Sequence, residues 1–385
     1  MNIVYYTSTD FLDSDMPLIR EYQQMGHRVK VFIPLAPFNI KGSVVNIKEL
    51  KPVDDIVKAT EYSEILVYKD FIDLNDIYFV NRSTSSVRTM AYFRTMKKMC
   101  KMIADFNPDA IHCTFPLDTL DWLLIRFRKK LVLTMHDPFQ HSSKGGLRTN
   151  LFRWLSVKLV PKIVLLNSVQ KQDFQRVNHV SCKRILINRL GVYTASRTFV
   201  KDDAENDCNT LLFFGKISPY KGIEYLCEAM VDVHREYPQA KLIIAGGGKI
   251  PFDYTPYEGL DYIELRNRFI PTPEIAELLG KVGFTVCPYR DATQSGVIMT
   301  AFALDCPIVA SNVGALSEQI EDEKTGLLVP PCDSKALASA IKRMLGNPGL
   351  QHQMRENIRL RNTNSENSWS NIAAKYIEFY NKKLH

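Results

Sequence analysis

One stretch decides the fold of this chain: Leu211-Leu-Phe-Phe-Gly-Lys-Ile-Ser-Pro-Tyr-Lys-Gly-Ile-Glu-Tyr-Leu-Cys-Glu-Ala-Met230. Its first four residues are apolar, as expected of a strand that is buried on both faces of a parallel sheet. Gly215 ends the strand, and apolar residues recur at helical spacing from Ile223 onward. Free amides and the helix dipole make such a helix N-terminus an anion site. With Lys216 and Lys221 in the turn, the stretch predicts a diphosphate site, although both could be ordinary surface lysines of a βα loop.

A second stretch repeats this arrangement: Cys287-Pro-Tyr-Arg-Asp-Ala-Thr-Gln-Ser-Gly-Val-Ile-Met-Thr-Ala-Phe-Ala-Leu-Asp-Cys-Pro-Ile-Val-Ala-Ser311. We expect a strand ending at Pro288, a polar loop closing with Ser295-Gly296, and a helix over 297–304. Again a glycine stands at the start of a helix. Two such sites facing one cleft can hold both ends of a nucleotide diphosphate.

Together the two stretches resemble the retaining glycosyltransferases of family 4 (glycosyl transferases group 1), which have the GT-B fold. Lys216 and Lys221-Gly222 match that family's first glycine and lysine motif, and 307–314 and 325–330 match its last strands. Its Glu-x7-Glu motif is not matched, because Thr300 stands at the second glutamate, and Ala292, beside Asp291, near the first. Residues 291–296 are more similar to a subgroup with Ala-Thr-Gln-Ser-Gly at this place.

The resemblance implies an α/β fold of two Rossmann-like, doubly wound parallel-sheet domains that face a cleft. We expect an acceptor-binding domain over 1–195, a nucleotide-sugar-binding domain over 208–365, and a C-terminal helix over 366–385 that returns to the first domain. The polar stretch 198–209 is the expected boundary. A chain of 385 residues is long enough for two cores.

The resemblance also implies which residues act on the donor. The candidate catalytic residues are His136, Lys216, Lys221 and Asp291, of which the two lysines would stabilise the leaving diphosphate and Asp291 would orient the sugar. The candidate donor-binding residues are Gly215, Lys216, Lys221, Gly222, Gly246, Arg268, Gln294, Ser295, Gly296, Val297 and Thr300. No metal and no cofactor beyond the donor substrate is expected.

On the acceptor side, His136 follows the apolar strand 131–135, and ligands of open α/β sheets bind at the carboxyl ends of strands. The sequence there resembles the family's acceptor-side strand end, so we expect His136 to bind sugar, with Asp137 and His112 as weaker candidates. A satisfied structural histidine is the alternative. Asp13-Ser14-Asp15 looks like a metal motif, but helix capping is its expected role.

The charge of the chain is uneven, because residues 1–192 carry 28 lysines and arginines against 18 aspartates and glutamates. Such a basic half could contact nucleic acid, a polyanionic substrate or anionic lipid. A helix expected over 87–103 and clusters at 126–130 and 148–162 mix basic and aromatic residues. Most charged helix faces are simply solvated, and contact with an anionic membrane surface is the alternative that these mixed clusters raise; nucleic acid is not expected as a partner.

Other features of the sequence are consistent with a cytoplasmic protein, either free or peripheral at the inner face of the membrane. Its first residues predict a strand rather than a signal peptide, and no run approaches ~18 apolar residues. The eight cysteines include no Cys-x-x-Cys pair, which argues against a zinc site or a disulfide framework. Residues 37–80 suggest an extra hairpin or irregular strands, with 65–68 and 76–80 extended.

The function predicted from these patterns is sugar transfer, with retained configuration, from a nucleotide-diphosphate sugar to the hydroxyl of a glycan or lipid-linked acceptor. Assembly of a bacterial-type surface polysaccharide or glycoconjugate is the expected setting. A non-catalytic protein that binds nucleotide sugar or glycan is the main alternative, because Thr300 replaces a glutamate. Another GT-B enzyme, such as a nucleotide-sugar epimerase, is the second. Pocket shape decides the nucleotide, the sugar and the acceptor.

Overall fold

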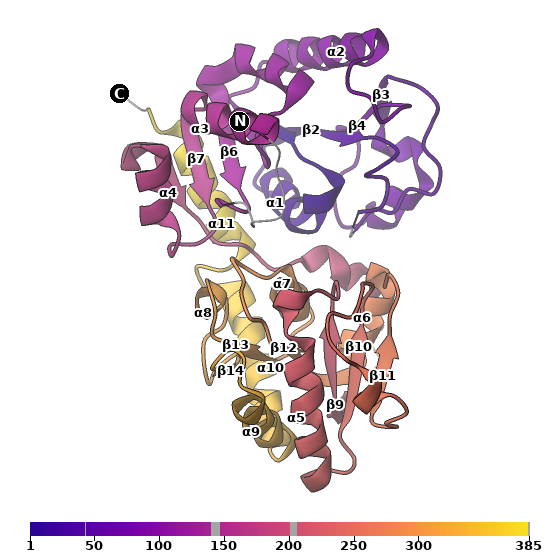
Figure 1. The fold of residues 1–385 in the computed structure, drawn as a ribbon. Coiled ribbons are helices and arrows are strands. Elements are labelled where there is room, and N and C mark those ends of the chain that lie inside the picture. Colours follow the sequence, from indigo (N-terminus) through magenta and orange to yellow (C-terminus); the bar gives the residue numbers. More distant parts are fainter. Residues whose placement is uncertain (43, 140–146, 201–205, 384–385) are drawn as a thin grey trace. The chain divides into compact units, whose positions relative to one another are not determined.

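The structure is a computed structural model that describes residues 1–42, 44–139, 147–200 and 206–383. The chain divides into two compact units (Figure 1). Unit 1 comprises residues 1–191 together with 369–385, and unit 2 comprises residues 192–368. Each unit is built around one sheet, so the prediction of two parallel-sheet α/β domains is confirmed.

In the described part of unit 1, eight strands form a sheet in the order β3-β4-β2-β1-β5-β6-β7-β8, and every pair except β3 with β4 is parallel. The strands are β1 Asn2–Tyr6, β2 Arg28–Leu35, β3 Ile56–Lys58, β4 Ile77–Asn81, β5 Ala110–Cys113, β6 Leu131–Met135, β7 Lys162–Leu165 and β8 Ile185–Ile187. The strand order reverses between β1 and β5, and open α/β sheets bind ligands at the carboxyl ends of strands near such a point.

Helices cover both faces of this sheet. They are α1 Leu12–Gln24, α2 Met90–Phe106, α3 Leu147–Leu159, α4 Lys171–Asn178 and α11 Trp369–Asn381, with the 3-10 segments η1 Thr9–Phe11, η2 Ala59–Glu61, η3 Ser63–Tyr68, η4 Thr119–Lys130 and η5 Cys182–Arg184. Side chains of a strand alternate between faces. Val4 and Tyr6 of β1 therefore join the apolar core with α2 and η4, whereas Tyr5 faces α1 and α11.

The last helix, α11, is fastened to unit 1 by buried hydrogen bonds. The Tyr380 hydroxyl lies 2.6 Å from His112 Nδ1 and 2.9 Å from the Tyr22 hydroxyl. The Asn188 side chain donates to the Ile372 carbonyl over 3.1 Å. Buried polar groups are nearly always hydrogen-bonded, and here the partners come from α1, β5 and the segment after β8.

In the described part of unit 2, six parallel strands form a sheet in the order β11-β10-β9-β12-β13-β14. The strands are β9 Asp207–Phe214, β10 Lys241–Ala245, β11 Ile263–Arg266, β12 Val282–Cys287, β13 Ile308–Ser311 and β14 Gly326–Val329. The helices are α5 Ile223–Glu236, α6 Thr272–Lys281, α7 Gly296–Ala303, α8 Leu316–Gln319, α9 Ser334–Leu345 and α10 Pro348–Asn364, with η6 Thr194–Phe199, η7 Pro219–Lys221 and η8 Thr255–Tyr257.

Two local predictions for unit 1 are wrong. The segment 65–68, expected to be extended, belongs to the 3-10 helix η3. Asp13 and Asp15 lie in the first turn of α1 rather than at its N-cap, which is Phe11. The expected piece 76–80 is a strand of the main sheet, because β4 pairs parallel with β2.

Candidate functional site

The first predicted turn of unit 2 lies at the carboxyl end of β9. Gly215 and Gly222 both have positive φ angles, +115° and +62°, which side chains other than glycine rarely adopt. A Cβ on Gly222 would lie 2.1 Å from the Pro288 carbonyl oxygen, so the loops after β9 and β12 touch here. Because the strand order of unit 2 reverses between these two strands, this contact marks its topological switch point.

The loop after β10 packs against the same turn. Gly215 donates to the Ala245 carbonyl, and Ile217 to the Gly247 carbonyl, each over 3.0 Å. A Cβ on Gly246 would lie 1.8 Å from the Gly215 carbonyl oxygen, which only glycine allows. A ligand can therefore approach the backbone closely at the carboxyl ends of β9, β10 and β12. Such close approach suits a flat or phosphorylated ligand.

Lys221 is a buried cation, with 7% of its surface exposed. Its ammonium lies 3.7 Å from the centroid of the Tyr289 ring, a cation–π contact. Burial lowers the pKa of Lys221 to about 8, while the neighbouring Cys287 thiol acts in the opposite direction. The Tyr289 hydroxyl lies 3.2 Å from Ser295 Oγ, so the lysine is connected through one ring to the start of α7.

The N-terminus of α7 is the second predicted anion site. Gln319 holds the Ser295 backbone from both sides, accepting from its amide over 2.8 Å and donating to its carbonyl over 3.3 Å. The N-cap residue of α7, Ser295, makes no side-chain capping hydrogen bond with the described residues, so the first amides of the helix remain available for a ligand. A Cβ on Gly215 would lie 3.3 Å from Val297 Cγ2, which places the first turn of α7 beside the Gly215 turn.

Other predicted donor residues lie on the same loops with different roles. Lys216 and Asp291 are exposed, and neither forms an ion pair within the part of the chain that the structure describes. Arg268 forms an ion pair with Glu274 of α6 over 2.6 Å, so its side chain is already engaged. The Thr300 hydroxyl donates to the Gly296 carbonyl of the same helix over 3.0 Å. The family pattern has a glutamate at this position. Gln294 is half-buried in the loop before α7.

Three residues of this region were not predicted from the sequence. Tyr289 contacts Lys221, and an aromatic residue directly after a buried strand was the signal for it. Glu224 and Arg290 form an ion pair that joins the N-terminal turn of α5 to the loop after β12, and the Arg290 amide also donates to the Tyr220 carbonyl over 2.8 Å. No local pattern indicated that pair, because its partners are far apart in the sequence.

In unit 1, His136 lies directly after β6, as predicted. Its ring stacks on Phe11, with centroids 4.1 Å apart and 12° between the planes. Burial lowers the pKa of His136 to about 4, so the ring is neutral at pH 7 and offers one donor and one acceptor. His112 instead lies inside the core, where Nε2 contacts Thr134 over 2.6 Å and Nδ1 contacts Tyr380. The Asp137 carbonyl accepts from the Arg153 guanidinium.

Asp15 is a buried carboxylate that lines the same small cavity as His136. It accepts hydrogen bonds from the Tyr5 hydroxyl, over 3.0 Å, and from Thr7. Burial raises the pKa of Asp15 to about 7, although these hydrogen bonds act to lower it. A small cavity is lined by Tyr5, Asp15, Thr134, His136, Arg189 and Tyr376, among others.

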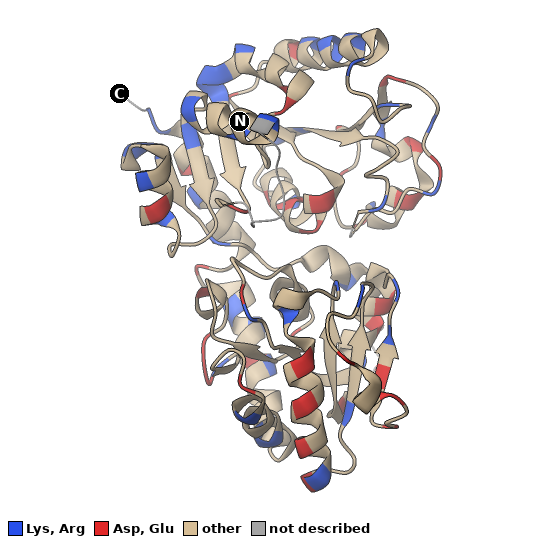
Figure 2. Ribbon diagram, viewed as in Figure 1, with Lys and Arg blue, Asp and Glu red and all other residues tan. Residues whose placement is uncertain are grey.

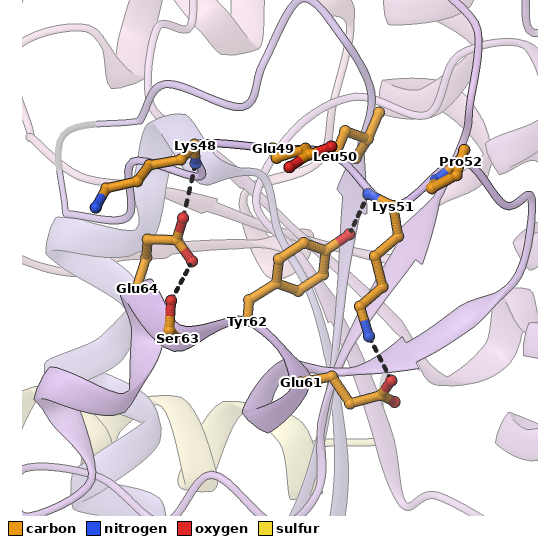
Figure 3. Close-up of a pocket in the computed structure, with 9 residues that line it drawn as sticks. All are labelled: Lys48, Glu49, Leu50, Lys51, Pro52, Glu61, Tyr62, Ser63 and Glu64. Carbon is orange, nitrogen blue, oxygen red and sulfur yellow. Dashed lines mark hydrogen bonds and ion pairs between the residues drawn. The ribbon is translucent and has the colours of Figure 1, made fainter.

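A separate pocket lies between residues 48–52 and 61–64 of unit 1 (Figure 3). Its charged and polar groups bond across the pocket walls: Lys51 forms an ion pair with Glu61 over 2.6 Å, and the Lys48 amide donates to Glu64. No predicted site residue lines it. Since its walls satisfy one another, the pocket carries no argument for a ligand.

The described residues also bear on metal binding and on membrane crossing. No group of three or more histidine, cysteine, aspartate or glutamate side chains is arranged to hold a metal ion in that part of the chain. Within the same residues, every helix is too short or too polar to cross a bilayer.

Comparison with known proteins gives two family matches. Residues 208–347 match the family described as glycosyl transferases group 1, and residues 17–195 match the one described as Glycosyltransferase Family 4. An alpha-D-kanosaminyltransferase of Streptomyces kanamyceticus is 27% identical over 219 residues, 52% of this chain and 55% of that protein. The chain thus spans about half the length of that curated relative.

Solved structures share the fold over the whole chain. Sucrose-phosphate synthase of Thermosynechococcus elongatus superposes with a TM-score of 0.64 at 19% identity, covering 99% of this chain and 98% of that one. Anabaena HepE in complex with UDP-glucose superposes with a TM-score of 0.65 at 13% identity, covering 98% and 99%. At these identities the likeness establishes the fold alone.

Proposed function

Because this chain belongs to the family 4 glycosyltransferases (glycosyl transferases group 1), we propose that it moves a sugar from a nucleotide-diphosphate sugar to an acceptor hydroxyl with retained configuration. One observation carries the proposal. Buried Lys221, the Gly215 turn and the uncapped start of α7 meet at the switch point of the unit 2 sheet. Lysine cations and helix N-terminal amides at one place are chemistry for a diphosphate.

The residues of the nucleotide-sugar site have different roles in this proposal. Lys221 and the amides of residues 296–298 neutralise the charge that develops on the diphosphate as it leaves, and Lys216 adds a solvent-exposed cation. The glycine-rich loops after β9 and β10 allow the ribose or base to approach the backbone. Exposed Phe269, next to Gly247, offers a ring for stacking of the base. Asp291 is proposed to orient the sugar.

The chemical step needs no carboxylate base in this proposal. The bond between the anomeric carbon and the phosphate oxygen breaks, and the acceptor oxygen bonds to that carbon on the same face. The proton of the acceptor hydroxyl passes to the leaving phosphate oxygen, so charges and atoms balance. The protein accelerates the reaction by positioning the two substrates and by stabilising the charge that develops on the diphosphate.

For the acceptor we propose a glycan or lipid-linked glycan bound by unit 1, in the assembly of a surface polysaccharide or glycoconjugate. Neutral His136, held by its stack on Phe11, can accept from or donate to a sugar hydroxyl throughout the neutral pH range. The likeness of residues 291–296 to a family subgroup stays a prediction.

The basic surface of unit 1 supports contact with an anionic membrane on its cytoplasmic side. The elements α2, η4 and α3 are neighbours, and lysines and arginines gather along them (Figure 2). Helix α3 also exposes Leu151 and Trp154, at 54% and 50% of their surface, beside exposed Arg148. Apolar and aromatic side chains flanked by cations favour an interfacial helix on anionic lipid.

Liposome sedimentation tests this surface. Wild type should bind vesicles that contain phosphatidylglycerol but not pure phosphatidylcholine, and Leu151→Ser with Trp154→Ser should lose most of that binding. Phe269→Ser, which removes an exposed ring from unit 2, is the matched control. Equal binding by wild type and the double variant would refute the membrane contact.

The donor proposal is tested by thermal-shift measurements with UDP, GDP, ADP and CMP and their sugars, followed by a turnover assay. A ligand at about 100 times its dissociation constant adds roughly 2.7 kcal/mol of stability. One nucleotide should stabilise wild type but not Lys216→Ala/Lys221→Ala, and its sugar should be consumed. Binding without any consumption of donor, with or without acceptor, would favour the non-catalytic alternative; an interconverted but untransferred sugar would favour an epimerase.

A further inference from the structure

Unit 1 contains a buried arginine outside the residues discussed so far. Arg82 follows β4 directly, and its amide donates to the Leu35 carbonyl at the end of β2 over 2.9 Å. Only 5% of its surface is exposed. Its Nε is buried and has no hydrogen-bond partner among the described residues, and within the same part of the chain its guanidinium forms no ion pair.

The surroundings of Arg82 are aromatic rather than acidic. Its Cζ lies 5.2 Å from the centroid of Phe38 and 5.0 Å from that of Tyr92. The Tyr92 ring is buried, whereas Phe38 is 69% exposed. The two rings contact the guanidinium through cation–π interactions. They do not accept directed hydrogen bonds from its five N–H groups, as an oxyanion would.

Two carboxylates act on Arg82 electrostatically, and both are bonded elsewhere. Asp54 accepts from the Ser83 amide over 2.6 Å and from its hydroxyl over 2.7 Å. Asp121 accepts from the Tyr6 hydroxyl over 2.6 Å. A buried cation without a hydrogen-bonded counterion is unfavourable, and a bound oxyanion would supply the missing partner.

Arg82 lies where a ligand-binding residue of this fold is expected. It follows the carboxyl end of β4, and His136 follows the carboxyl end of β6 in the same sheet. Ligands of open α/β sheets bind at the carboxyl ends of the strands. Four strand spacings separate β4 from β6, or roughly 19 Å at about 4.8 Å each. A ligand reaching both residues is therefore extended.

We propose that Arg82 is an anion-binding residue for the acceptor, taking a phosphate or carboxylate group at a distance from the hydroxyl that receives the sugar. The inference rests on the proposed function for the identification of the ligand as the acceptor. Arginine presents a planar fork that binds either oxyanion through two parallel hydrogen bonds. Exposed Phe38 lies over this fork and can stack on the sugar ring that carries the anion.

The test uses tryptophan fluorescence during urea unfolding, because all three tryptophans, Trp122, Trp154 and Trp369, lie in unit 1. The probes are inorganic phosphate, glucose 6-phosphate and glucuronate, each against sodium chloride at equal ionic strength. At least one oxyanion should raise the unfolding midpoint of wild type and of Lys221→Met, but not that of Arg82→Met. A preference for glucose 6-phosphate indicates a phosphate group on the acceptor, and a preference for glucuronate indicates an acidic sugar.

Control variants keep the result interpretable. Without ligand, Arg82→Met should be at least as stable as wild type, because an unpaired buried charge is replaced by an apolar side chain of similar length. Should it not fold, Arg82→Lys retains the charge without the fork and should bind the anion about tenfold more weakly. The inference is overturned if no anion raises the wild-type midpoint above chloride, or if Arg82→Met responds as wild type does. Donor turnover, measured separately, decides the proposed function.

Discussion

The Lys221 ammonium lies 3.7 Å from the centroid of the Tyr289 ring, and this contact brings together two loops that are 68 positions apart in the sequence. Burial lowers the pKa of Lys221 to about 8, so the lysine loses its charge only slightly above neutral pH. A diphosphate binds the charged form. We therefore expect the affinity for UDP, or for whichever nucleotide diphosphate stabilises the protein, to fall above pH about 8, by at most about tenfold per pH unit.

Isothermal titration between pH 7 and 10 measures this dependence, in a range where the diphosphate is predominantly ionised because its last pKa lies near about 6. Lys221→Arg supplies a cation that does not titrate there, so its affinity should be flat with pH. A wild-type affinity that is equally flat would show that Lys221 does not bind the diphosphate.

A second prediction concerns the glycines after β10. A Cβ on Gly246 would lie 1.8 Å from the Gly215 carbonyl oxygen, whereas one on Gly247 would come no closer than 3.2 Å to Arg268. Gly246→Ala must push the turns after β9 and β10 apart, so we expect at least tenfold weaker nucleotide binding. Gly247→Ala is the matched control and should keep most of the binding. Similar affinities for both variants would argue that this turn is not part of the donor site.

A third prediction uses the buried carboxylate of unit 1. The pKa of Asp15 is raised to about 7 in the folded protein, so between about pH 4 and 7 the folded state holds a proton that the unfolded state has lost. Unit 1 should therefore lose stability as pH rises through this range, by about 1.4 kcal/mol per pH unit. Asp15→Asn removes this loss.

Urea unfolding followed by tryptophan fluorescence at pH 5 and pH 8 provides the measurement. Relative to wild type, Asp15→Asn should gain stability at pH 8 and gain less at pH 5. Asp13→Asn, which alters a neighbouring carboxylate of α1, is the control. A pH-independent difference between Asp15→Asn and wild type would mean that Asp15 does not titrate in this range.

Much of the architecture could be predicted because it depends on local pattern. The apolar run 211–214 and the helical spacing after Gly222 predicted β9, the turn and α5, and Ser295-Gly296 predicted the start of α7. These elements are predicted by the spacing of apolar residues and by the positions of glycines. Both patterns can be recognised within a window of about 20 residues. The strand of His136 was readable for the same reason.

The remainder depends on which strands become neighbours. Tyr289 contacts Lys221 only because β12 pairs with β9 across two intervening strands in the sequence. Asp15 appeared to be a capping residue, but its carboxylate bonds to Tyr5 and Thr7, whose positions depend on how α1 packs on β1. Arg82 carries no local signal in the sequence, and it is buried at the end of β4 against the rings of Phe38 and Tyr92.

The fourth prediction concerns the attachment of α11. The Tyr380 hydroxyl bonds to His112 Nδ1 and to the Tyr22 hydroxyl, and all three groups are buried. Tyr380→Phe leaves a buried ring nitrogen and a buried hydroxyl without that partner, which typically destabilises a protein by about 1–3 kcal/mol. The pKa of His112 is lowered to about 3 by burial and by His136, so the ring cannot recover the loss by taking a proton near neutral pH.

Urea unfolding by tryptophan fluorescence at pH 7 reports on this change directly, because Trp369 begins α11. Tyr78→Phe removes a hydroxyl that bonds to the Asp76 carboxylate at a half-buried position, and it should change stability by less than about 0.5 kcal/mol. If the two variants lose equal stability, the buried network does not hold α11, and apolar packing of its other side chains does. A larger loss in Tyr380→Phe than in Tyr78→Phe would support the role of the buried network in holding α11.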